Sequence, residues 1–384
     1  LALYCVLGLS SLMAQDYSRY VDPRIGSGGF GRTFPGPCMP YGMAKPGPDA
    51  VSMPNAGWAP MPEPVKGFSQ MHVSGTGGGQ KYGNILIQPF LDAGEIIQTR
   101  VYEKIALGYY ACTFENGIRT EITASERCAF YRLDYGRKQK GKLLIDVATF
   151  LGIDTIPDKR ETQQYVDSYV TCDGKYTVSG WSTVRGGWNN GGPYTVYFYL
   201  QSDVPLSNCD VPLSNSDAPL CNKVKDSKTR LDVTFSKSVV NLKAGISHIS
   251  IAQARRNIPS CGFDAQLKNV RKTWNGKLGK IEISGTEKQK RMFYTALYHT
   301  MLMPVDKSGE NPHFSATPYY DDYYAIWDTY RTSMPLLTLI EEPQQRDMVN
   351  SLLNIYKYDG YMPDARSGNW NGRTQGGSNA DIVI

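Results

Sequence analysis

The hexapeptide "IWDTYR", residues 326–331, holds residue types that a sugar-binding site uses. Trp327 offers a flat aromatic face, and the Asp328 carboxylate can accept hydrogen bonds from two sugar hydroxyls. Arg331 follows three positions later, about one helical turn on, where it is placed to orient the carboxylate. The alternative is a helix amino end at which Asp328 only serves as a cap. These residues alone leave both interpretations open.

A second stretch, Phe68 to Asn84, contains five glycines and the single histidine His72. It does not fit a phosphate loop, because its glycines lead into a predicted strand at Ile85 instead of a helix. It does not fit a metal site, because no second histidine or carboxylate stands at ligand spacing. We therefore expect a sandwich loop that packs toward a helical domain and walls a pocket, with His72 as its polar contact. A flexible solvent-exposed loop is the alternative.

A third glycine-rich segment, "GSGGFG" at residues 26–31, matches the dinucleotide-binding pattern G-x-G-x-x-G. That pattern requires a helix directly after the glycines, so that the pyrophosphate meets the helix amino end. Here the sequence continues with "RTFPGPCMPYG", whose prolines exclude such a helix. We interpret these glycines as backbone turns.

The composition excludes several classes of protein. The chain has 384 residues, 41% of them hydrophobic, which is long enough for more than one globular core. The net charge of +5 is small, and no Lys/Arg-rich block appears, so no nucleic-acid partner is predicted. The 26 tyrosines and six tryptophans favour a ligand with both polar and apolar faces, such as a sugar.

The hydrophobic pattern changes once along the chain. From Tyr82 to about Ala254 it predicts strand after strand, with hairpin turns at Asn116–Gly117 and Asp173–Gly174. Many strands joined by turns, with no helices between them, predict an antiparallel β-sandwich, which we place at residues 18–256.

The remainder is predicted to be helical. Apolar residues at helical spacing predict a connecting helix within residues 257–284. Thr286 and Gln289 form a capping-box pattern before the next helix, and residues 343–360 form another, opened by a proline and stopped by a glycine. The second domain is expected at residues 285–384, incomplete at its end. The residues of the connecting pattern are Phe263, Leu267, Val270, Trp274 and Leu278.

The first residues, "LALYCVLGLSSLMAQ", form an apolar segment of signal-peptide length that ends in small residues. We expect residues 1–15 to be a signal peptide that lacks its charged start, cleaved after Ala14 or Gln15. A transmembrane helix is the alternative, but about thirteen apolar residues fall short of the roughly 20 that span a bilayer. The sequence predicts an exported protein without a membrane span, which is periplasmic, outer-membrane-associated or secreted.

Seven cysteines remain after such a cleavage and none forms a C-x-x-C pair, so no zinc framework is predicted. Cys209 and Cys221 are a candidate local disulfide. Both lie in a tandem repeat of seven residues, "DVPLSNC", "DVPLSNS" and "DAPLCNK", between Asp203 and Lys223. Because every copy contains a proline, we interpret the repeat as a duplicated loop between two strands.

Four ordered blocks resemble the signature blocks of glycoside hydrolase family 92, the exo-acting α-mannosidases: "YVDPRIGSGGFGRTFPGPCMPYGM", "GFSQMHVSGTG", "FYTALYHTMLMP" and "WDTYRTSMPLLTLI". The resemblance covers the chain from Tyr20 to its end. It implies an antiparallel β-sandwich followed by a linker helix and the start of an (α/α)6 barrel. It also implies calcium-dependent release of terminal α-linked mannose, with inversion, from mannose-terminated glycans such as N-glycans or mannan.

The resemblance also bears on single residues. It places Trp58 on the sandwich side of the sugar pocket, beside the expected contacts of His72 and Asp328. The chain departs from the histidine-rich form of the first two blocks at Phe30, Arg32 and Gln70. By the family pattern the catalytic acid, the catalytic base and the calcium ligands are expected beyond residue 384, so we assign none of them here.

The linkage preference expected from the resemblance is α-1,2. Two other functions remain open from the sequence. One is a sandwich module that binds glycan without hydrolysing it, and the other is a different (α/α)-barrel glycosidase or lyase.

Export is the first testable expectation. Expression of the complete gene should yield a mature protein that begins near Gln15 or Asp16 in the periplasmic or secreted fraction, because the preceding residues have signal-peptide character. Amino-terminal sequencing of that fraction measures the cleavage site. Recovery of an uncleaved protein from the cytoplasm would contradict the expectation.

Overall fold

A computed structural model describes residues 15–29, 31–75, 78–91, 96–136, 140–152, 162–207, 229–323, 325–372, 377 and 379–384. The predicted signal peptide therefore lies almost wholly outside the described residues, and so do Cys209, Cys221 and most of the tandem repeat.

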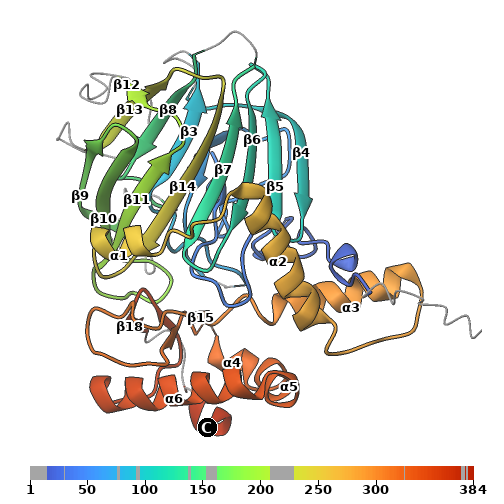
Figure 1. Cartoon of the computed structure of the whole chain (residues 1–384). Coiled ribbons are helices and arrows are strands. Elements are labelled where there is room, and N and C mark those ends of the chain that lie inside the picture. Colours follow the sequence, from blue (N-terminus) through green and yellow to red (C-terminus); the bar gives the residue numbers. More distant parts are fainter. Residues whose placement is uncertain are drawn as a thin grey trace, which may run out of the picture.

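Two antiparallel sheets form the amino-terminal part of the described chain (Figure 1). The first has the order β1-β2-β3-β8-β13-β12: Gly47–Ala50, Val65–Ser69, Leu86–Phe90, Lys142–Asp146, Arg230–Phe235 and Leu206–Ser207. The second has the order β4-β5-β6-β7-β14-β11-β10-β9: Arg100–Ala106, Tyr109–Phe114, Arg119–Ala124, Cys128–Asp134, Val239–Ser247, Tyr194–Ser202, Thr177–Gly186 and Gln163–Gly174.

The two sheets enclose one hydrophobic core. Along β11 and β13, buried residues alternate with more exposed ones, because successive side chains of a strand point to opposite faces. The core draws on both sheets, with Ile145 and Val233 from one and Tyr131 and Leu242 from the other. The prediction of antiparallel sheets followed by helices is confirmed.

Three details of the strand prediction were wrong. Strands β1 and β2 precede Tyr82, where the first strand was expected. The β9–β10 hairpin turns at residues 175–176, because Gly174 still pairs with Thr177. The strand predicted to reach Ala254 ends at Ser247.

After Ser247 the chain forms helix α1, Ile251–Arg256, whose amino end is capped by the Ser250 side chain. Helix α2, Phe263–Leu278, crosses the outer face of the eight-stranded sheet near β6 and β7 (Figure 1). Its buried side chains include Phe263, Val270, Trp274 and Leu278, which confirms most of the predicted apolar stripe. Helix α3, Glu287–His299, begins with the predicted capping box.

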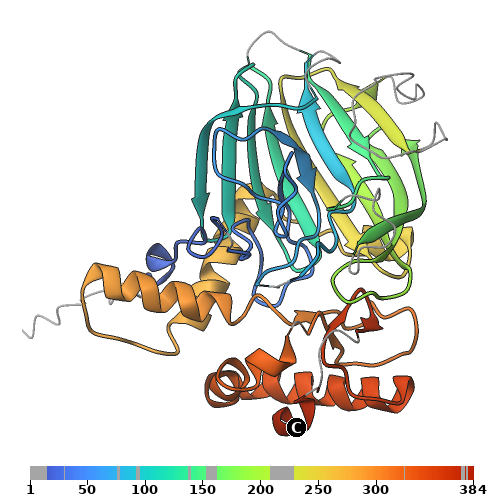
Figure 2. The ribbon, with the colours of Figure 1, turned by 180° about the vertical axis from the view of Figure 1, so that it is seen from behind.

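The last part of the chain lies against one end of the sandwich (Figure 2). It contains helices α4 (Ile326–Thr329), α5 (Ser333–Ile340), α6 (Glu342–Asp359) and α7 (Ala380–Val383). A two-stranded pair of β15 (Val305–Asp306) with β16 (Tyr320–Asp321) precedes α4, and a second pair, β17 (Arg366–Ser367) with β18 (Trp370–Asn371), lies between α6 and α7. As predicted, a proline opens α6 and the left-handed Gly360 ends it.

No helix in the described ranges is both long and apolar enough to cross a membrane. Cys172 is disulfide-bonded. Cys38, Cys112, Cys128 and Cys261 are free thiols, and the first three are buried.

Helix α2 depends on a close approach to the sandwich at Gly108, in the β4–β5 turn. A Cβ atom on Gly108 would lie 2.3 Å from Cγ1 of Val270, which is fully buried. Gly117, in the next turn, has a similar left-handed φ of +88°, but a Cβ there would meet nothing within 4 Å.

Gly108→Ala should therefore destabilise the protein more than Gly117→Ala does. Both substitutions carry the backbone cost of a left-handed alanine, about 1 kcal/mol, but only Gly108→Ala adds an overpacking cost of about 1–3 kcal/mol. Urea unfolding of both variants measures the difference. Equal losses would show that α2 is not tightly packed at this turn.

Candidate functional site

The predicted sugar platform, Trp327, lies where the last part of the chain meets the sandwich. Its half-buried side chain packs against the sandwich core. Its ring centroid lies 6.4 Å from that of Trp188, with 33° between the planes. Trp188 comes from the β10–β11 loop, so two indoles far apart in sequence share one face of the interface. Trp188 is 2% exposed and belongs to the sandwich core, so it supports Trp327 from behind, and Trp327 is the ring that can pack against the apolar face of a sugar.

Asp328, the next residue, has an exposed carboxylate. Helix α4 spans only Ile326–Thr329, and its amino end is Ala325, which is left-handed and gives no side-chain cap. Asp328 is therefore not the cap of this helix, which removes the alternative left open by the sequence. The carboxylate follows Trp327 in the chain and forms no ion pair among the described residues. Its oxygens can accept hydrogen bonds from hydroxyl groups.

The predicted link between Arg331 and Asp328 was wrong. The exposed Arg331 guanidinium lies 5.0 Å from the ring centre of Tyr330 and donates to the Tyr330 hydroxyl at 3.2 Å. The Arg331 amide still donates to the Asp328 carbonyl oxygen at 3.4 Å, but the guanidinium turns to the Tyr330 ring, so the two side chains form no ion pair.

His72 was expected to face the cleft between the domains, and this was also wrong. Its side chain is fully buried in the sandwich and stacks on Phe34 at 5.0 Å. Nδ1 lies 2.7 Å from the Lys45 carbonyl oxygen and Nε2 lies 2.7 Å from Asp49 Oδ1. Both nitrogens are thus occupied by neighbours from the sandwich.

Trp58 is a buried anchor of the sandwich. It is 7% exposed, belongs to the main core, and donates from Nε1 to Glu103 Oε1 at 3.1 Å. Its contact with a sugar stays a prediction.

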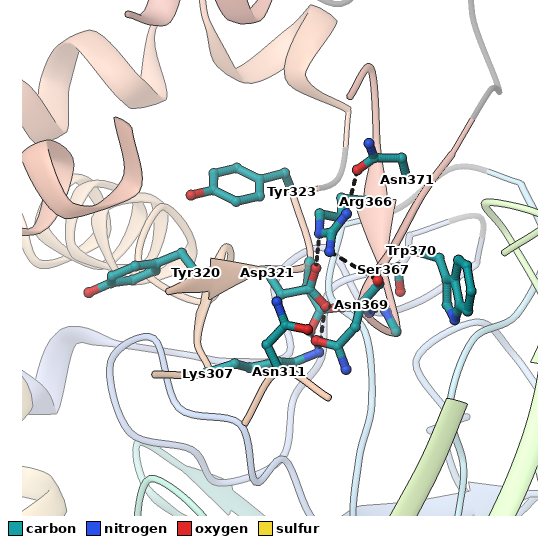
Figure 3. A network of polar contacts seen from close by, with 12 residues as sticks. Lys307, Asn311, Tyr320, Asp321, Tyr323, Arg366, Ser367, Asn369, Trp370 and Asn371 are labelled. Atoms are coloured by element: carbon teal, nitrogen blue, oxygen red, sulfur yellow. Dashed lines mark hydrogen bonds and ion pairs between the residues drawn. The ribbon is translucent and has the colours of Figure 1, made fainter. Parts of the chain in front are cut away.

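A buried ion network supports this interface (Figure 3). Lys307 Nζ lies 2.8 Å from Asp321 Oδ2 and 3.0 Å from Asp322 Oδ2. Asp321 Oδ1 in turn lies 2.9 Å from Arg366 Nε, and Arg366 also pairs with Asp359 at 2.7 Å. The side chains of Lys307, Asp321, Asp322 and Arg366 are at most 2% exposed.

The charges in this network stabilise one another. Burial alone would raise the pKa of the Asp321 carboxyl, but Lys307 and Arg366 lower it below its ordinary value. Burial alone would lower the pKa of Lys307, but Asp321 and Asp322 raise it above its ordinary value. Lys307 and Asp321 therefore remain charged at neutral pH.

Tyr82 connects the network to the sandwich. Its hydroxyl donates to Asp322 Oδ1 at 2.5 Å and accepts from Lys307 Nζ and the Gly368 amide, each at 3.0 Å. The stretch from Phe68 to Asn84 therefore contacts the helical part at Tyr82. The contact was predicted at residues 74–79, where 76 and 77 lie outside the described residues and the bonds of Ser74, Gly75 and Gly78 go to Phe34, Arg32 and Asn55.

A second polar connection involves Lys81 and the β10–β11 loop. Lys81 Nζ donates to Asn189 Oδ1 at 2.9 Å, and Asn189 Nδ2 donates to the carbonyl oxygens of Ser367 and Trp370, each at 2.9 Å. Burial lowers the pKa of Lys81 to about 7. The same loop carries Trp188, so these bonds fix the loop whose buried indole packs against Trp327.

The Trp370 ring lies directly over two glycines of this loop. A Cβ atom on Gly191 or Gly192 would come within 2.9 Å of Trp370 side-chain atoms, so only glycine permits this approach. The ring also meets His313 edge-on, with ring centroids 4.5 Å apart. Its Nε1 donates to the Pro193 carbonyl oxygen at 2.9 Å.

None of Lys81, Tyr82, Lys307 and Arg366 was predicted from the sequence. The one available signal was the segment "PYYDDYY", residues 318–324, in which two adjacent aspartates stand among tyrosines. Carboxylates in so aromatic a setting require cationic partners, although the sequence does not say which.

The described residues hold no group of three or more His, Cys, Asp or Glu side chains that could bind a metal ion. The adjacent carboxylates of Asp321 and Asp322 are already paired with cations. They do not fit a calcium site.

The network yields a stability prediction. Asp321→Asn should lower the free energy of unfolding by about 3–5 kcal/mol, because it leaves Lys307 and Arg366 buried with too little negative charge. Asp359→Asn is the matched control: Asp359 also pairs with Arg366, but its side chain is 30% exposed and its loss should cost about 1 kcal/mol or less. Urea unfolding compares the two. If Asp321→Asn lowers the free energy of unfolding no more than Asp359→Asn does, the network does not hold the interface together.

Comparisons with known proteins agree with this architecture. The family model described as the glycosyl hydrolase family 92 N-terminal domain matches residues 20–247, and the one described as the family 92 catalytic domain matches residues 251–384. An uncharacterized secreted glycosidase of Arthroderma benhamiae is 28% identical over an alignment of length 402, gaps included. The alignment covers 96% of this chain and 49% of the relative.

Two solved structures share the fold. The family 92 α-mannosidase BT3965 of Bacteroides thetaiotaomicron superposes with a TM-score of 0.83 at 23% identity, over 96% of this chain and 54% of that one. The inverting mannosidase BT2199 of the same organism superposes with a TM-score of 0.75 at 23% identity, over 96% of this chain and 52% of that one. The chain thus spans about half the length of the relatives it matches. Since the two domain matches follow one another along nearly the whole chain, the resemblance is confirmed and the protein belongs to glycosyl hydrolase family 92.

Proposed function

We propose that the complete protein is an exported glycoside hydrolase that releases terminal α-linked mannose from glycans. The observation that carries the proposal is the half-buried Trp327, backed by the buried Trp188, beside the exposed Asp328 carboxylate, in a chain of family 92. The Trp327 indole suits the apolar face of a sugar ring, and the carboxylate suits two neighbouring hydroxyls.

Within this proposal Asp328 binds the sugar and does not transfer protons. An inverting glycosidase needs an acid and a base about 6.5–9.5 Å apart, with a water molecule between the base and the sugar. No catalytic pair is assigned among the described residues. Inversion is proposed from family membership, and one structural neighbour is described as an inverting mannosidase.

Calcium dependence and completion of an (α/α)6 barrel are further parts of the proposal. Both rest on family membership alone. A bound calcium ion would supply positive charge to hold sugar hydroxyls. Because Asp321 and Asp322 are held by Lys307 and Arg366, we name no calcium ligand among the described residues.

The proposed substrates are glycans that end in α-1,2-linked mannose, such as N-glycans or mannan, and the proposed location is the periplasm, the outer membrane or the medium. Support for the substrate comes from a relative solved in complex with mannoimidazole, with a TM-score of 0.83. Support for export comes from the secreted relative and from the apolar amino end of the sequence.

Asp328→Ala should lower kcat/KM for terminal mannosides by about 10- to 150-fold in the complete gene product. This is the effect of losing a charge-assisted hydrogen bond worth about 1.5–3 kcal/mol. The thermal unfolding temperature should change little, because the side chain is exposed and has no partner in the described interface. Initial rates on an aryl α-mannoside measure the effect.

Asp264→Ala is the control, because Asp264 is also in the first turn of a helix and its side chain is 80% exposed, on the outer face of the sandwich, although it pairs with Arg132 at 2.8 Å. It should leave kcat/KM unchanged. An Asp328→Ala enzyme with full activity would contradict the proposed role. Mannoside binding without any hydrolysis by the complete gene product would favour a carbohydrate-binding module instead.

A further inference from the structure

A row of aromatic side chains crosses one edge of the eight-stranded sheet. Tyr169 of β9 pairs in register with Trp181 of β10, and Trp181 pairs with Tyr197 of β11. Residues directly opposite one another on antiparallel strands have their side chains on the same face. Since neighbouring strands lie about 4.8 Å apart, the row spans roughly 10 Å. Figure 1 shows these strands together at one edge of the sheet.

The row lies on the outer face of the sandwich. Val170 follows Tyr169, Val196 and Phe198 stand on either side of Tyr197, and all three apolar residues belong to the sandwich core. Because successive side chains of a strand point to opposite faces, the rings of the row point away from that core. All three rings are partly exposed. The row is therefore a surface that a ligand can reach.

The row offers both a flat ring and polar atoms to a ligand. The Tyr169 ring stacks on Trp181, with centroids 4.9 Å apart and 27° between the planes, so it backs one side of the indole. The Trp181 indole nitrogen and the hydroxyl groups of Tyr169 and Tyr197 form no hydrogen bond with any described residue. None of these three atoms is buried, so each can bond to a hydroxyl group of a ligand.

Polar side chains flank the row on one side. Thr183 and Thr195 stand two residues from Trp181 and Tyr197 on their strands, so they lie on the same face, and Asp167 pairs in register with Thr183. The Asp167 carboxylate is exposed and forms no ion pair among the described residues. Its oxygens can therefore accept hydrogen bonds from a ligand.

Helix α1 flanks the row on the other side. Tyr199 of β11 lies under Arg255 of α1, with the guanidinium carbon 5.4 Å from the ring centre. Arg255 is exposed and forms no ion pair in the described part of the chain, so it can donate to a ligand. The helix is packed closely on β14, because a Cβ atom on Gly245 would lie 2.2 Å from the Ala254 carbonyl oxygen. One anion and one cation thus flank the row, which favours a ligand without net charge.

The row leads into a hollow of about 490 Å³ between the sheet and the start of α2. Gln201 lines the hollow and stands two residues beyond Tyr199, on the same face of β11. Its exposed amide forms no hydrogen bond with a described residue, and an amide offers two donors and one acceptor. A ligand longer than the row can therefore extend into this hollow.

Packing alone accounts for the stacked pair of Tyr169 and Trp181, because cross-strand aromatic pairs stabilise sheets. It does not account for a third ring, unpaired donors and a hollow on the same face. Sugars bind to this combination, because their apolar faces pack on aromatic rings and their hydroxyl groups pair with polar groups around the rings.

We propose that this outer face of β9, β10 and β11 is a second carbohydrate-binding surface, which holds an uncharged glycan chain and does not hydrolyse it. The surface goes beyond the proposed function, because it needs no catalytic group and lies apart from Trp327. Gly186, the last residue of β10, is five residues past Trp181, roughly 17 Å along an extended strand, and the loop that contacts Trp327 follows it. The surface would hold a distant part of a glycan whose end reaches Trp327, or a second glycan. Only the choice of mannan as a probe rests on the proposed function.

The test measures binding by native gel electrophoresis, in which a polysaccharide within the gel retards a protein that binds it. The probes are soluble mannan and hydroxyethylcellulose, an uncharged β-glucan. The complete gene product with Asp328→Ala serves as the background, so that the site at Trp327 is weakened and mannan is cleaved slowly.

Trp181→Thr and Tyr197→Thr each remove one ring of the row and introduce a residue that favours strands. Tyr102→Thr is the matched control. Tyr102 is 45% exposed on β4, at the opposite edge of the same sheet, where its partner in register is Thr113. Thermal unfolding of each variant measures the effect on stability separately from binding.

We expect mannan to retard the Asp328→Ala protein. Trp181→Thr and Tyr197→Thr should each weaken that binding about tenfold or more, because a ring no longer buries apolar surface against the sugar. Tyr102→Thr should not change it. Trp181→Phe keeps a flat ring and should retain most of the binding, which a loss of sheet stability alone would not predict.

A row that serves only the sheet gives a different result. Trp181→Thr and Tyr197→Thr would then lower the unfolding temperature and leave the retardation of the folded protein unchanged, which would overturn the proposal. If Trp181→Thr does not fold, Tyr197→Thr still decides. Failure of both polysaccharides to retard the Asp328→Ala protein would also overturn it. Retardation that depends on the row, in a protein that cleaves no mannoside, would refute the proposed function and leave this inference standing.

Discussion

The free-energy cost of burying the Lys307 ammonium constrains the whole junction between the two parts of the chain. An unpaired charge in this position would be prohibitive, so two carboxylates and a tyrosine hydroxyl must lie within bonding distance of one amine. Asp321 must then also meet Arg366, which draws the β17–β18 hairpin to the same point. Because Tyr82 belongs to the sandwich, this requirement fixes where the helical part sits, and with it where Trp327 meets Trp188.

The same principle recurs at Glu310, whose side chain is fully buried. It accepts from the Ser247 hydroxyl at 2.6 Å, the His248 amide at 2.8 Å and the Asn257 side chain at 2.8 Å. These donors come from the end of β14 and from the residue that follows α1. One carboxylate of the helical part therefore ties down the point at which the chain leaves the sandwich. The two clusters hold separate segments, so the junction resists rotation as well as separation.

Sequence reasoning succeeded where the signal is local. The capping box at Thr286, the turn at Asn116–Gly117 and the ends of α6 each depend on residues within one turn, and all are present. It failed where contacts with residues distant in the sequence determine the local structure. "SHISIAQA" alternates like a strand, yet the bonds from Ser247 and His248 to Glu310 end β14 and Ser250 caps a helix instead. For the candidate site, Trp327 and Asp328 were predicted from residue type, and their contact with a sugar stays a prediction. His72 was misjudged because its partners, Lys45 and Asp49, lie more than twenty residues away.

A polar junction has a consequence that an apolar one would lack. Well-packed hydrophobic residues of similar volume often match or exceed the stability of a buried ion pair, so stability alone does not explain this network. Apolar surfaces, however, permit small shifts in register at little cost, whereas the Lys307 cluster tolerates one arrangement only. A carboxylate that must meet two hydroxyls of one sugar ring needs its backbone held to a fraction of an ångström. Asp328 stands on a four-residue helix that has no side-chain cap of its own, so it depends on its surroundings for that position. The first amide of that helix, of Ile326, donates to the Asp364 carbonyl oxygen at 3.3 Å, two residues before Arg366, so the register set by the buried charges reaches the helix through this segment.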